Sequence, residues 1–437
     1  MHTRISQFSG SRRAGSVLLV AVMIMMLVAT MTLAFLQIGV RFTRELSTRI
    51  DDERALMLAE AALEESLFAM RAGGSGSVGT AAAPARQGDG VCWATATPVG
   101  VSLSLVQAAG MCGSGRAAVQ RLVFSYPPGQ LESFAIFANN DLELESNVLI
   151  DSFDAGAGTY ATQLAMAGTG YVSAMAITGS NGNVTVASSV EVWGDLHPGV
   201  GMSVSVPGSS SVSGSLQPLP EPIDLPPVST PTLPFAGNVS VEGVGVMLPS
   251  GDYSYGFFKT LSNTSITVTG PARIVTDTLT LASNSTLTLD TSTGPIEIYV
   301  KGASSMASNA AIITTKKSAV DCSLYFVGGP GQTATLASNS DFYGRVYSQQ
   351  GKIVINSNFN VYGSVIADRL VLNANSQVHY DEALRNTLDN DDLRFVPFGW
   401  SMAGFPLAVF TSDRRDPFML LGVDPTDLAS PAASHAP

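Results

Sequence analysis

The chain has 437 residues, a formal net charge of −12 and 13% charged residues, about half of the roughly 25% that is usual in soluble domains. It is too apolar to be disordered throughout, and its acidity argues against general binding of nucleic acid. Four histidines and three cysteines leave little for a metal centre or an iron–sulfur cluster. We therefore expect no metal, no cofactor and no nucleic-acid partner.

The charge is divided unevenly along the chain. The first 50 residues contain six arginines and one glutamate, a net charge of +5, so the remainder carries −17. A basic head is thus followed by an acidic body.

Residues 16–40 contain no charged side chain. As a helix, these 25 residues are about 37 Å long, and a bilayer core is about 30 Å thick. Arg12 and Arg13 stand directly before this run, which predicts a cytoplasmic N-terminus and a body outside the inner membrane. The alternative is a secretory signal peptide, but its apolar region would be shorter.

The helical pattern continues beyond the apolar run. Apolar residues recur at spacings of three and four: Leu56, Ala59, Leu63, Leu67 and Met70. Gly73 and Gly74 then end the pattern. The sequence therefore predicts one helix over residues 16–70, about 80 Å long. Such a helix suits an assembly that packs many of them side by side.

Two short motifs in this region resemble the N-terminus of type IV pilin-like proteins, above all PilX-type minor pilins: Arg13-Ala14-Gly15-Ser16-Val17-Leu18-Leu19 and Leu58-Ala59-Glu60-Ala61-Ala62-Leu63-Glu64. The resemblance covers about residues 10–70. It implies that a prepilin peptidase cuts between Gly15 and Ser16. It also implies other pilin or pseudopilin subunits and an assembly machinery as partners.

One position departs from that resemblance. Most major pilins have glutamate at the fifth mature position, where this chain has Val20. In the family, this glutamate neutralises the N-terminal amine of a neighbouring subunit inside an apolar core. The valine at this position favours a minor or tip-located role for this chain. The alternative is a plain single-span anchor that is not processed.

Residues 71–130 are expected to form a linker and a small β-region. Cys92 and Cys112 flank its middle strand. Because disulfides persist outside the cytoplasm, we expect a Cys92–Cys112 bridge that supports a region with little core of its own. The alternative is two unpaired, buried thiols. Cys322 is expected to be buried in a strand.

Residues 131–385 repeat a pattern of apolar-x-apolar-x-Ser-Asn at intervals of 17 to 30 residues. Such periods indicate a solenoid, and the short alternating strands favour a right-handed parallel β-helix. Asparagine tolerates the left-handed conformation that sharp corners need, and stacked asparagines can form a hydrogen-bonded ladder. The predicted ladder comprises Asn284, Asn309, Asn339, Asn358 and Asn375.

A proline-rich stretch over residues 203–235 interrupts the repeats, and it is expected to be an extended excursion from the β-helix. The body resembles an uncharacterised bacterial β-helix domain that often follows PilX-type N-termini. That resemblance implies no activity.

The acidic residues of the body stand singly near turns, where aspartate is common for conformational reasons. His197 and His379 have no visible partner in the sequence. A carbohydrate-cleaving β-helix would need clustered carboxylates, so we expect no catalytic residue and no enzyme activity.

The end of the chain, residues 386–437, changes character and is rich in aromatic residues up to Phe410. We expect its first part to cap the open end of the solenoid and its last residues to be disordered. The alternative is an exposed patch that docks a partner.

The sequence as a whole favours a mainly β protein with a long N-terminal transmembrane helix. Its predicted function is that of a non-enzymatic, prepilin-like structural component of a type IV pilus or a type II secretion-like pseudopilus. It would sit in the inner membrane and reach the cell surface on assembly. The alternative is a cell-envelope scaffold, or a surface adhesin or glycan-binding protein, with a simple anchor.

Overall fold

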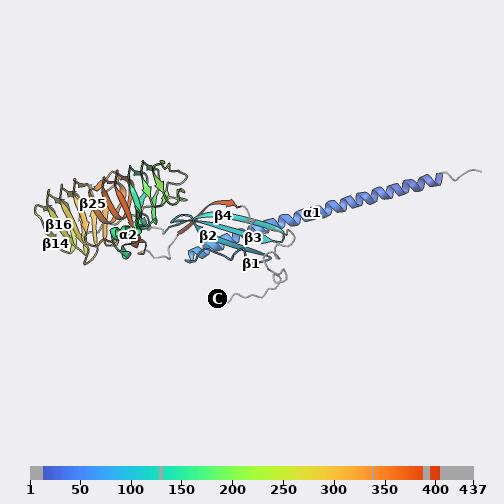
Figure 1. Ribbon diagram of the computed structural model, residues 1–437, viewed down its shortest axis with the longest axis horizontal. Coiled ribbons are helices and arrows are strands. Elements are labelled where there is room, and N and C mark those ends of the chain that lie inside the picture. The colour runs from blue at the N-terminus through green and yellow to red at the C-terminus, as the bar shows by residue number, and fades with distance from the viewer. Residues whose placement is uncertain (1–12, 127–130, 337–338, 387–393, 404–437) are drawn as a thin grey trace, which may run out of the picture.

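The computed structural model describes residues 13–126, 131–336, 339–386 and 394–403. It consists of a long helix, a small antiparallel sheet and a parallel β-solenoid of about ten turns, arranged one after another along the long axis of the molecule (Figure 1). This architecture confirms the predicted mainly β fold with one long N-terminal helix.

Helix α1 (Arg13–Arg71) is continuous over 59 residues. Its first part projects freely from the rest of the molecule, and its last part lies against the small sheet (Figure 1). The helix ends where Gly73 adopts a positive φ of 77°, a conformation that glycine takes without steric cost.

The small sheet has five antiparallel strands in the order β1-β2-β3-β4-β28. Their bounds are Ala85–Gln87 (β1), Gly90–Pro98 (β2), Leu103–Cys112 (β3), Gly115–Tyr126 (β4) and Arg394–Met402 (β28).

Strand β28 is the aromatic segment that we expected to cap the solenoid, and the structure places it elsewhere. It pairs with β4 from Arg394 opposite Tyr126 to Met402 opposite Val119. The unpaired edge of β4 offers a full row of backbone partners, which a solenoid end of short strands does not. Residues 404–437, which include the predicted disordered tail, lie outside the described part of the chain.

The first strands of the solenoid are β5 (Ile136–Ala138), β6 (Leu142–Leu144), β7 (Leu149–Phe153), β8 (Ala176–Ser180), β9 (Val184–Val186), β10 (Glu191–Val192), β11 (Gly194–His197) and β12 (Ser211–Val212). After the proline-rich stretch come β13 (Phe235–Val241), β14 (Val246–Leu248), β15 (Gly251–Thr260), β16 (Ser265–Thr269), β17 (Ala272–Thr276), β18 (Leu279–Leu281), β19 (Thr286–Asp290) and β20 (Ile296–Val300). The last are β21 (Ser304–Met306), β22 (Ala311–Thr314), β23 (Cys322–Phe326), β24 (Thr333–Leu336), β25 (Ser340–Ile355), β26 (Phe359–Leu372) and β27 (Gln377–Asp381).

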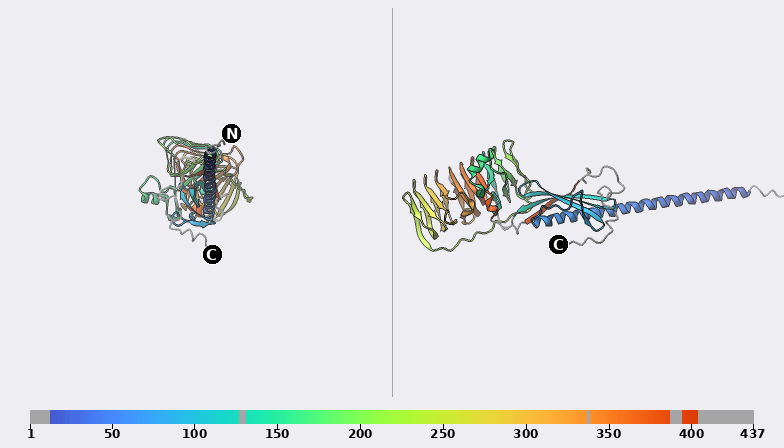
Figure 2. Two further views of the ribbon diagram at one scale, coloured as in Figure 1. Left: turned by 90° about the vertical axis from the view of Figure 1, so that its right-hand side faces the viewer. Right: turned by 60° about the horizontal axis from the view of Figure 1, so that its bottom comes forward.

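The turns do not stack in chain order. Strand β26 pairs with β5 and β6, and β27 pairs with β7, so the last turn stacks on the first. The extended segment 220–234, here called the strap, carries the chain from this base to the far end of the solenoid, the tip, where β13 begins. From the tip the turns are built back towards the base (Figure 2).

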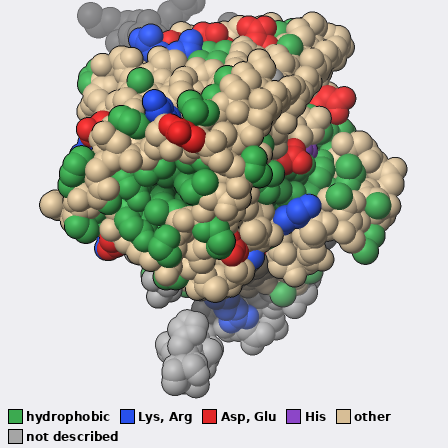
Figure 3. All heavy atoms as spheres, turned by 90° about the vertical axis from the view of Figure 1, so that its left-hand side faces the viewer, with side chains coloured by type: hydrophobic (Ala, Val, Ile, Leu, Met, Phe, Trp, Pro, Cys, Tyr) green, Lys and Arg blue, Asp and Glu red, His purple; other side chains and the backbone are tan. Residues whose placement is uncertain are grey.

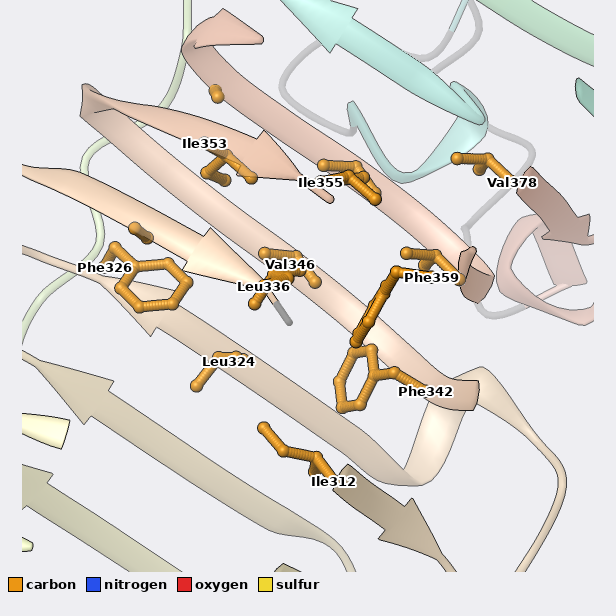
Figure 4. Close-up of a cluster of buried hydrophobic side chains, with 14 of the residues drawn as sticks. Ile312, Leu324, Phe326, Leu336, Phe342, Val346, Ile353, Ile355, Phe359 and Val378 are labelled. Carbon is orange, nitrogen blue, oxygen red and sulfur yellow. The ribbon is translucent and has the colours of Figure 1, made fainter. Parts of the chain in front are cut away.

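The solenoid core follows from the alternation of side chains along each strand. In β16, Ile266 and Val268 point inward and are buried, whereas Thr267 between them points outward. Because neighbouring strands are parallel and in register, inward residues form continuous columns along the axis. Figure 4 shows Phe342 and Phe359 from adjacent turns pointing into this core.

Four helices of three or four residues and one helix of eight residues decorate the described part of the solenoid. They are η1 (Leu131–Ser133), η2 (Ala155–Ala157), η3 (Ala319–Asp321) and α3 (Ala383–Asn386), together with α2 (Tyr160–Ala167). Helix α2 begins at Thr159, whose side chain accepts a hydrogen bond from the N–H of Thr162, and ends at Gly168 in the left-handed region.

Candidate functional site

The projecting part of α1 exposes large apolar side chains around its whole circumference. Leu18 and Phe35 are each 70% exposed. The mean hydropathy of its most apolar 18-residue window is 2.6, and none of that window is buried. Among the described residues, this helix alone is long and apolar enough to cross a membrane. Gly15 and Ser16 lie in its first turns, and their processing stays a prediction.

The second part of α1 is anchored on the small sheet by small side chains. Ala55, Ala59 and Ala62 are fully buried, because the helix backbone lies almost in contact with strand β3. A Cβ atom at Gly110 would stand 2.2 Å from the carbonyl oxygen of Ala55. A larger residue at this position would push the helix away from the sheet.

Cys92 and Cys112 are free thiols in the structure, and the predicted disulfide is absent. Cys92 lies opposite Gly110 and Cys112 lies opposite Gly90, so the two cysteines are diagonal neighbours. Diagonal Cα atoms across such a pair are about 7–8 Å apart, beyond the usual reach of a disulfide. Burial, and secondarily the charge of Glu65, raises the pKa of Cys92.

The structure brings the five predicted ladder asparagines together at one corner of the solenoid. All have φ between 57° and 62°, as do Asn147, Ser189 and Asn263. Side-chain amides donate to side-chain oxygens along the row at 3.1–3.3 Å: Asn358 to Asn339, Asn339 to Asn309, Asn309 to Asn284, Asn284 to Asn263, and Asn147 to Asn375. The ladder aligns successive turns, and its role is structural.

A buried Ser–His–Asp cluster lies where the small sheet meets the base of the solenoid. Ser102 Oγ lies 3.0 Å from Asp195 Oδ2 and 3.0 Å from His197 Nε2. His197 Nδ1 donates to the carbonyl oxygen of Gln217 at 2.7 Å. In a hydrolytic triad, the aspartate holds Nδ1 while the serine faces Nε2. Here both lie on the Nε2 side and all three side chains are buried, so the cluster fastens two parts of the fold and does not expose a nucleophile.

The carboxylate of Asp195 is held by several donors. Its burial would raise its pKa, but hydrogen bonds from His197, Ser215 and Ser102 outweigh this effect and hold the pKa below its usual range. The N–H groups of Ser102 and Ser215 donate to its two oxygens at 2.9 and 2.8 Å. The junction therefore depends on an ionised aspartate.

A second buried pair joins the first and last turns of the solenoid. His379 Nδ1 lies 2.5 Å from Asp151 Oδ1, and Tyr160 donates its hydroxyl to Asp151 Oδ2 at 2.9 Å. The His379 ring packs against those of Tyr160 and Tyr362, with centroids 3.9 and 4.8 Å away, and the two tyrosine rings also contact each other, with centroids 5.5 Å apart. The pKa of Tyr160 is raised, mainly by burial and secondarily by the charge of Asp151. With both partners buried, this cluster also holds turns together.

Neither histidine is therefore alone, contrary to the prediction from sequence. Asp195 lies two residues before His197, a spacing that puts both on one face of a strand, so the sequence held a signal for this pair. Asp151 and His379 are 228 residues apart and meet only because β27 stacks on β7. No local pattern could have revealed them.

Aromatic side chains form a row on one face of the solenoid, but the strap covers it. Tyr299 and Tyr325 stack with centroids 4.9 Å apart, and Tyr347 continues the row. The Tyr347 hydroxyl donates to the carbonyl oxygen of Pro226, and Leu225 of the strap is buried against this face. The strap of the same chain thus packs on this aromatic row.

The tip of the solenoid is uncovered in the described structure. Strands β13 and β14 each pair on one side only, with β15 and β16. Phe235, Val244 and Met247 are 72%, 79% and 70% exposed, and Figure 3 shows hydrophobic side chains gathered on this end. Among the described residues, no group of three or more His, Cys, Asp or Glu side chains could hold a metal ion.

Comparison with known families gives one match, to a domain of unknown function (DUF7305), over residues 237–387. These residues form the returning turns of the solenoid. No curated protein matches the chain.

Several solved structures are similar in part, and three of them are described here. An ice-binding protein from the Antarctic ascomycete Antarctomyces psychrotrophicus is 13% identical with a TM-score of 0.32, over 57% of this chain and 96% of its own. An ice-binding protein from an Antarctic bacterium of the Flavobacteriaceae is 16% identical with a TM-score of 0.31, over 58% of this chain and 47% of its own. The competence-associated pilin ComZ from Thermus thermophilus is 12% identical with a TM-score of 0.25, over 81% of this chain and 97% of its own. Likenesses this distant carry no argument about function.

Proposed function

We propose that the chain is a non-enzymatic, membrane-anchored, prepilin-like structural component of a type IV pilus or type II secretion-like pseudopilus. The observation that carries this proposal is the division of α1 into two parts. Its first part exposes apolar side chains on all sides, and its second part is buried on a small antiparallel sheet. A subunit built in this way leaves the membrane only when other helices replace the lipid around it.

The rest of the molecule fits a body that is displayed by that helix. The solenoid lies at the opposite end from the projecting part of α1 (Figure 1). The two buried His–Asp pairs serve its packing, and the charged groups on its surface are scattered along the turns. Its proposed place is outside the inner membrane, with the N-terminus in the cytoplasm. Its proposed partners are the inner membrane, a prepilin peptidase, other pilin or pseudopilin subunits and their assembly machinery.

Processing of the N-terminus tests this function. The mature full chain should begin at Ser16 in cells that have a prepilin peptidase and at Met1 in cells that lack it. Gly15→Val should block the cut, and Gly10→Val, at a glycine outside the predicted cleavage site, should leave it unchanged. N-terminal sequencing of the purified protein gives the answer. A chain that begins at Met1 in both strains would remove the prepilin-like function and leave a plain anchor.

A second candidate function, an envelope scaffold, is favoured by the uncovered tip. The small sheet packs against the base of the solenoid, whereas the tip is uncovered, so the proposed contact joins the tips of two chains. Val244→Asp should then abolish dimers of the full chain in detergent, measured by analytical ultracentrifugation. Met166→Asp is the matched control, because Met166 on α2 is equally exposed at 79%. A wild-type chain that stays monomeric at high concentration would exclude this scaffold.

A further inference from the structure

A pocket of about 490 Å³ lies on the side of the solenoid near its tip. It extends over the starts of β15, β17 and β20, which belong to three successive turns. Its described lining contains no residue of the strap, so the chain leaves this pocket open, in contrast to the aromatic row. Its volume falls within the range of about 300–1,000 Å³ that is usual for small-ligand sites.

Three charged side chains of the pocket form one column across these turns. Asp252 lies opposite Arg273, and Arg273 lies opposite Glu297. Because Ala272 and Ile274 on either side of Arg273 are buried, the alternation of the strands directs the charged column outward. Neighbouring strands are about 4.8 Å apart. The pocket thus offers acceptor, donor and acceptor groups in turn, at the spacing of the strands.

Contacts within the column orient these groups and leave polar atoms free. Arg273 donates from Nε and Nη2 to the two oxygens of Asp252 at 3.0 and 2.5 Å, and these bonds hold the pKa of Asp252 below its usual range. Tyr299 donates its hydroxyl to Glu297 Oε2 at 2.9 Å. Within the described part of the chain, Glu297 Oε1 and Arg273 Nη1 have no hydrogen-bond partner.

Two prolines form an apolar wall of the pocket. Pro271 and Pro295 stand directly before the paired residues Ala272 and Ile296, so they occupy the same corner in successive turns. Both are exposed. A Cβ atom at Gly294 would lie 2.9 Å from the Cβ atom of Pro271, so the absence of a side chain there lets the two corners approach. An apolar wall beside a few placed polar groups is typical of a ligand site.

We propose that this pocket binds a saccharide that carries no acidic group. Sugar hydroxyls both donate and accept hydrogen bonds, so they match the alternating column, while a sugar ring can pack on the two prolines. Two carboxylates against one guanidinium leave an excess of negative charge, which repels acidic sugars. The site goes beyond the proposed structural function and does not depend on it, since a chain with a plain anchor would carry the same pocket.

A glycan array with neutral, amino-bearing and acidic glycans tests the site, with the full chain in detergent as the binding protein. Wild type should bind glycans of the first two kinds and leave the acidic ones unbound. Glu297→Gln and Arg273→Gln should each lower this binding several-fold. Glu143→Gln is the matched control and should bind like wild type, because Glu143 also points outward, from strand β6 of the solenoid. An array without any bound glycan would overturn the proposal.

Reversal of one charge gives a readout that a merely structural role would not move. Glu297→Lys turns the excess negative charge of the column into an excess positive charge, so it should shift binding towards the acidic glycans. Its circular dichroism should match that of wild type, since Glu297 lies at the surface. Unchanged selectivity of this folded variant would overturn the proposal, as would binding of acidic glycans by wild type. The proposed function is judged separately, by the cut after Gly15.

Discussion

Asn309 donates from its side-chain amide to the side-chain oxygen of Asn284 at 3.2 Å, one solenoid turn nearer the tip. Asn309 also accepts a hydrogen bond from Asn339 at 3.1 Å on its other side. Its own φ is 58°, in a region that most residues avoid. One residue type thus fulfils two requirements of the corner, the backbone conformation and the link between turns.

Replacement of Asn309 separates these two contributions. Asn309→Ala loses the ladder bonds and places a Cβ-bearing residue in the left-handed region, so it should lower the free energy of unfolding by about 2 kcal/mol. Asn309→Gly keeps the conformation and should cost about 1 kcal/mol. Urea unfolding of the full chain in detergent, followed by circular dichroism, measures both. Equal losses for the two variants would contradict a role for backbone conformation.

Ser189 is the one described corner of this row that lacks asparagine, although its φ is 60°. The adjacent turn offers Asn147, whose side-chain amide already donates to Asn375 and whose side-chain oxygen can accept. Ser189→Asn should therefore raise the free energy of unfolding by about 0.5–1 kcal/mol. Ser188→Asn is the control, since Ser188 has no positive φ and bonds to Ser146. If the variant at 189 is no more stable than wild type, the ladder does not extend this far.

The sequence predicted the helix, the parallel solenoid and the asparagine corner because each follows from a local pattern. Three local features can be recognised in a short stretch of sequence. They are the alternation of apolar and polar residues within a strand, the absence of charged residues over 16–40, and the preference of asparagine for a positive φ. The stacking order was not readable, since it depends on the strap leading the chain to the tip before β13 begins. The Asp151–His379 pair follows from that stacking order, and the position of β28 follows from its pairing with the edge of β4. Neither can be predicted from a local sequence pattern.

The three described cysteines should all be free and unreactive in the folded protein. Burial raises the pKa of Cys322 to about 12, and burial likewise raises that of Cys92, so few thiolates exist at neutral pH. Iodoacetamide should label none of them in the native full chain and all three after denaturation without reductant. Mass spectrometry of the peptides measures this. A Cys92–Cys112 linked peptide would restore the disulfide that the diagonal strand positions argue against.

Acid should weaken the junction between the small sheet and the solenoid through Asp195. Its pKa is lower in the folded state than the value of about 3.9 in the unfolded chain. Between these two pKa values, the folded state therefore binds fewer protons than the unfolded state. The stabilisation is complete above the unfolded pKa and is lost as the pH falls through the folded pKa. Asp195→Asn should be less stable than wild type at pH 7, with a smaller further loss on acidification below about pH 4.

Asp277→Asn is the control for this experiment, because Asp277 is largely exposed and pairs with Lys301 at 3.6 Å, a contact of little energetic weight. Urea midpoints of the three proteins, measured across the acid range, separate the two sites. If the acid dependence of the Asp195→Asn variant matches that of wild type, the junction does not depend on this carboxylate. The hydrogen bonds from Ser102 and Ser215 would then serve only to satisfy buried backbone groups.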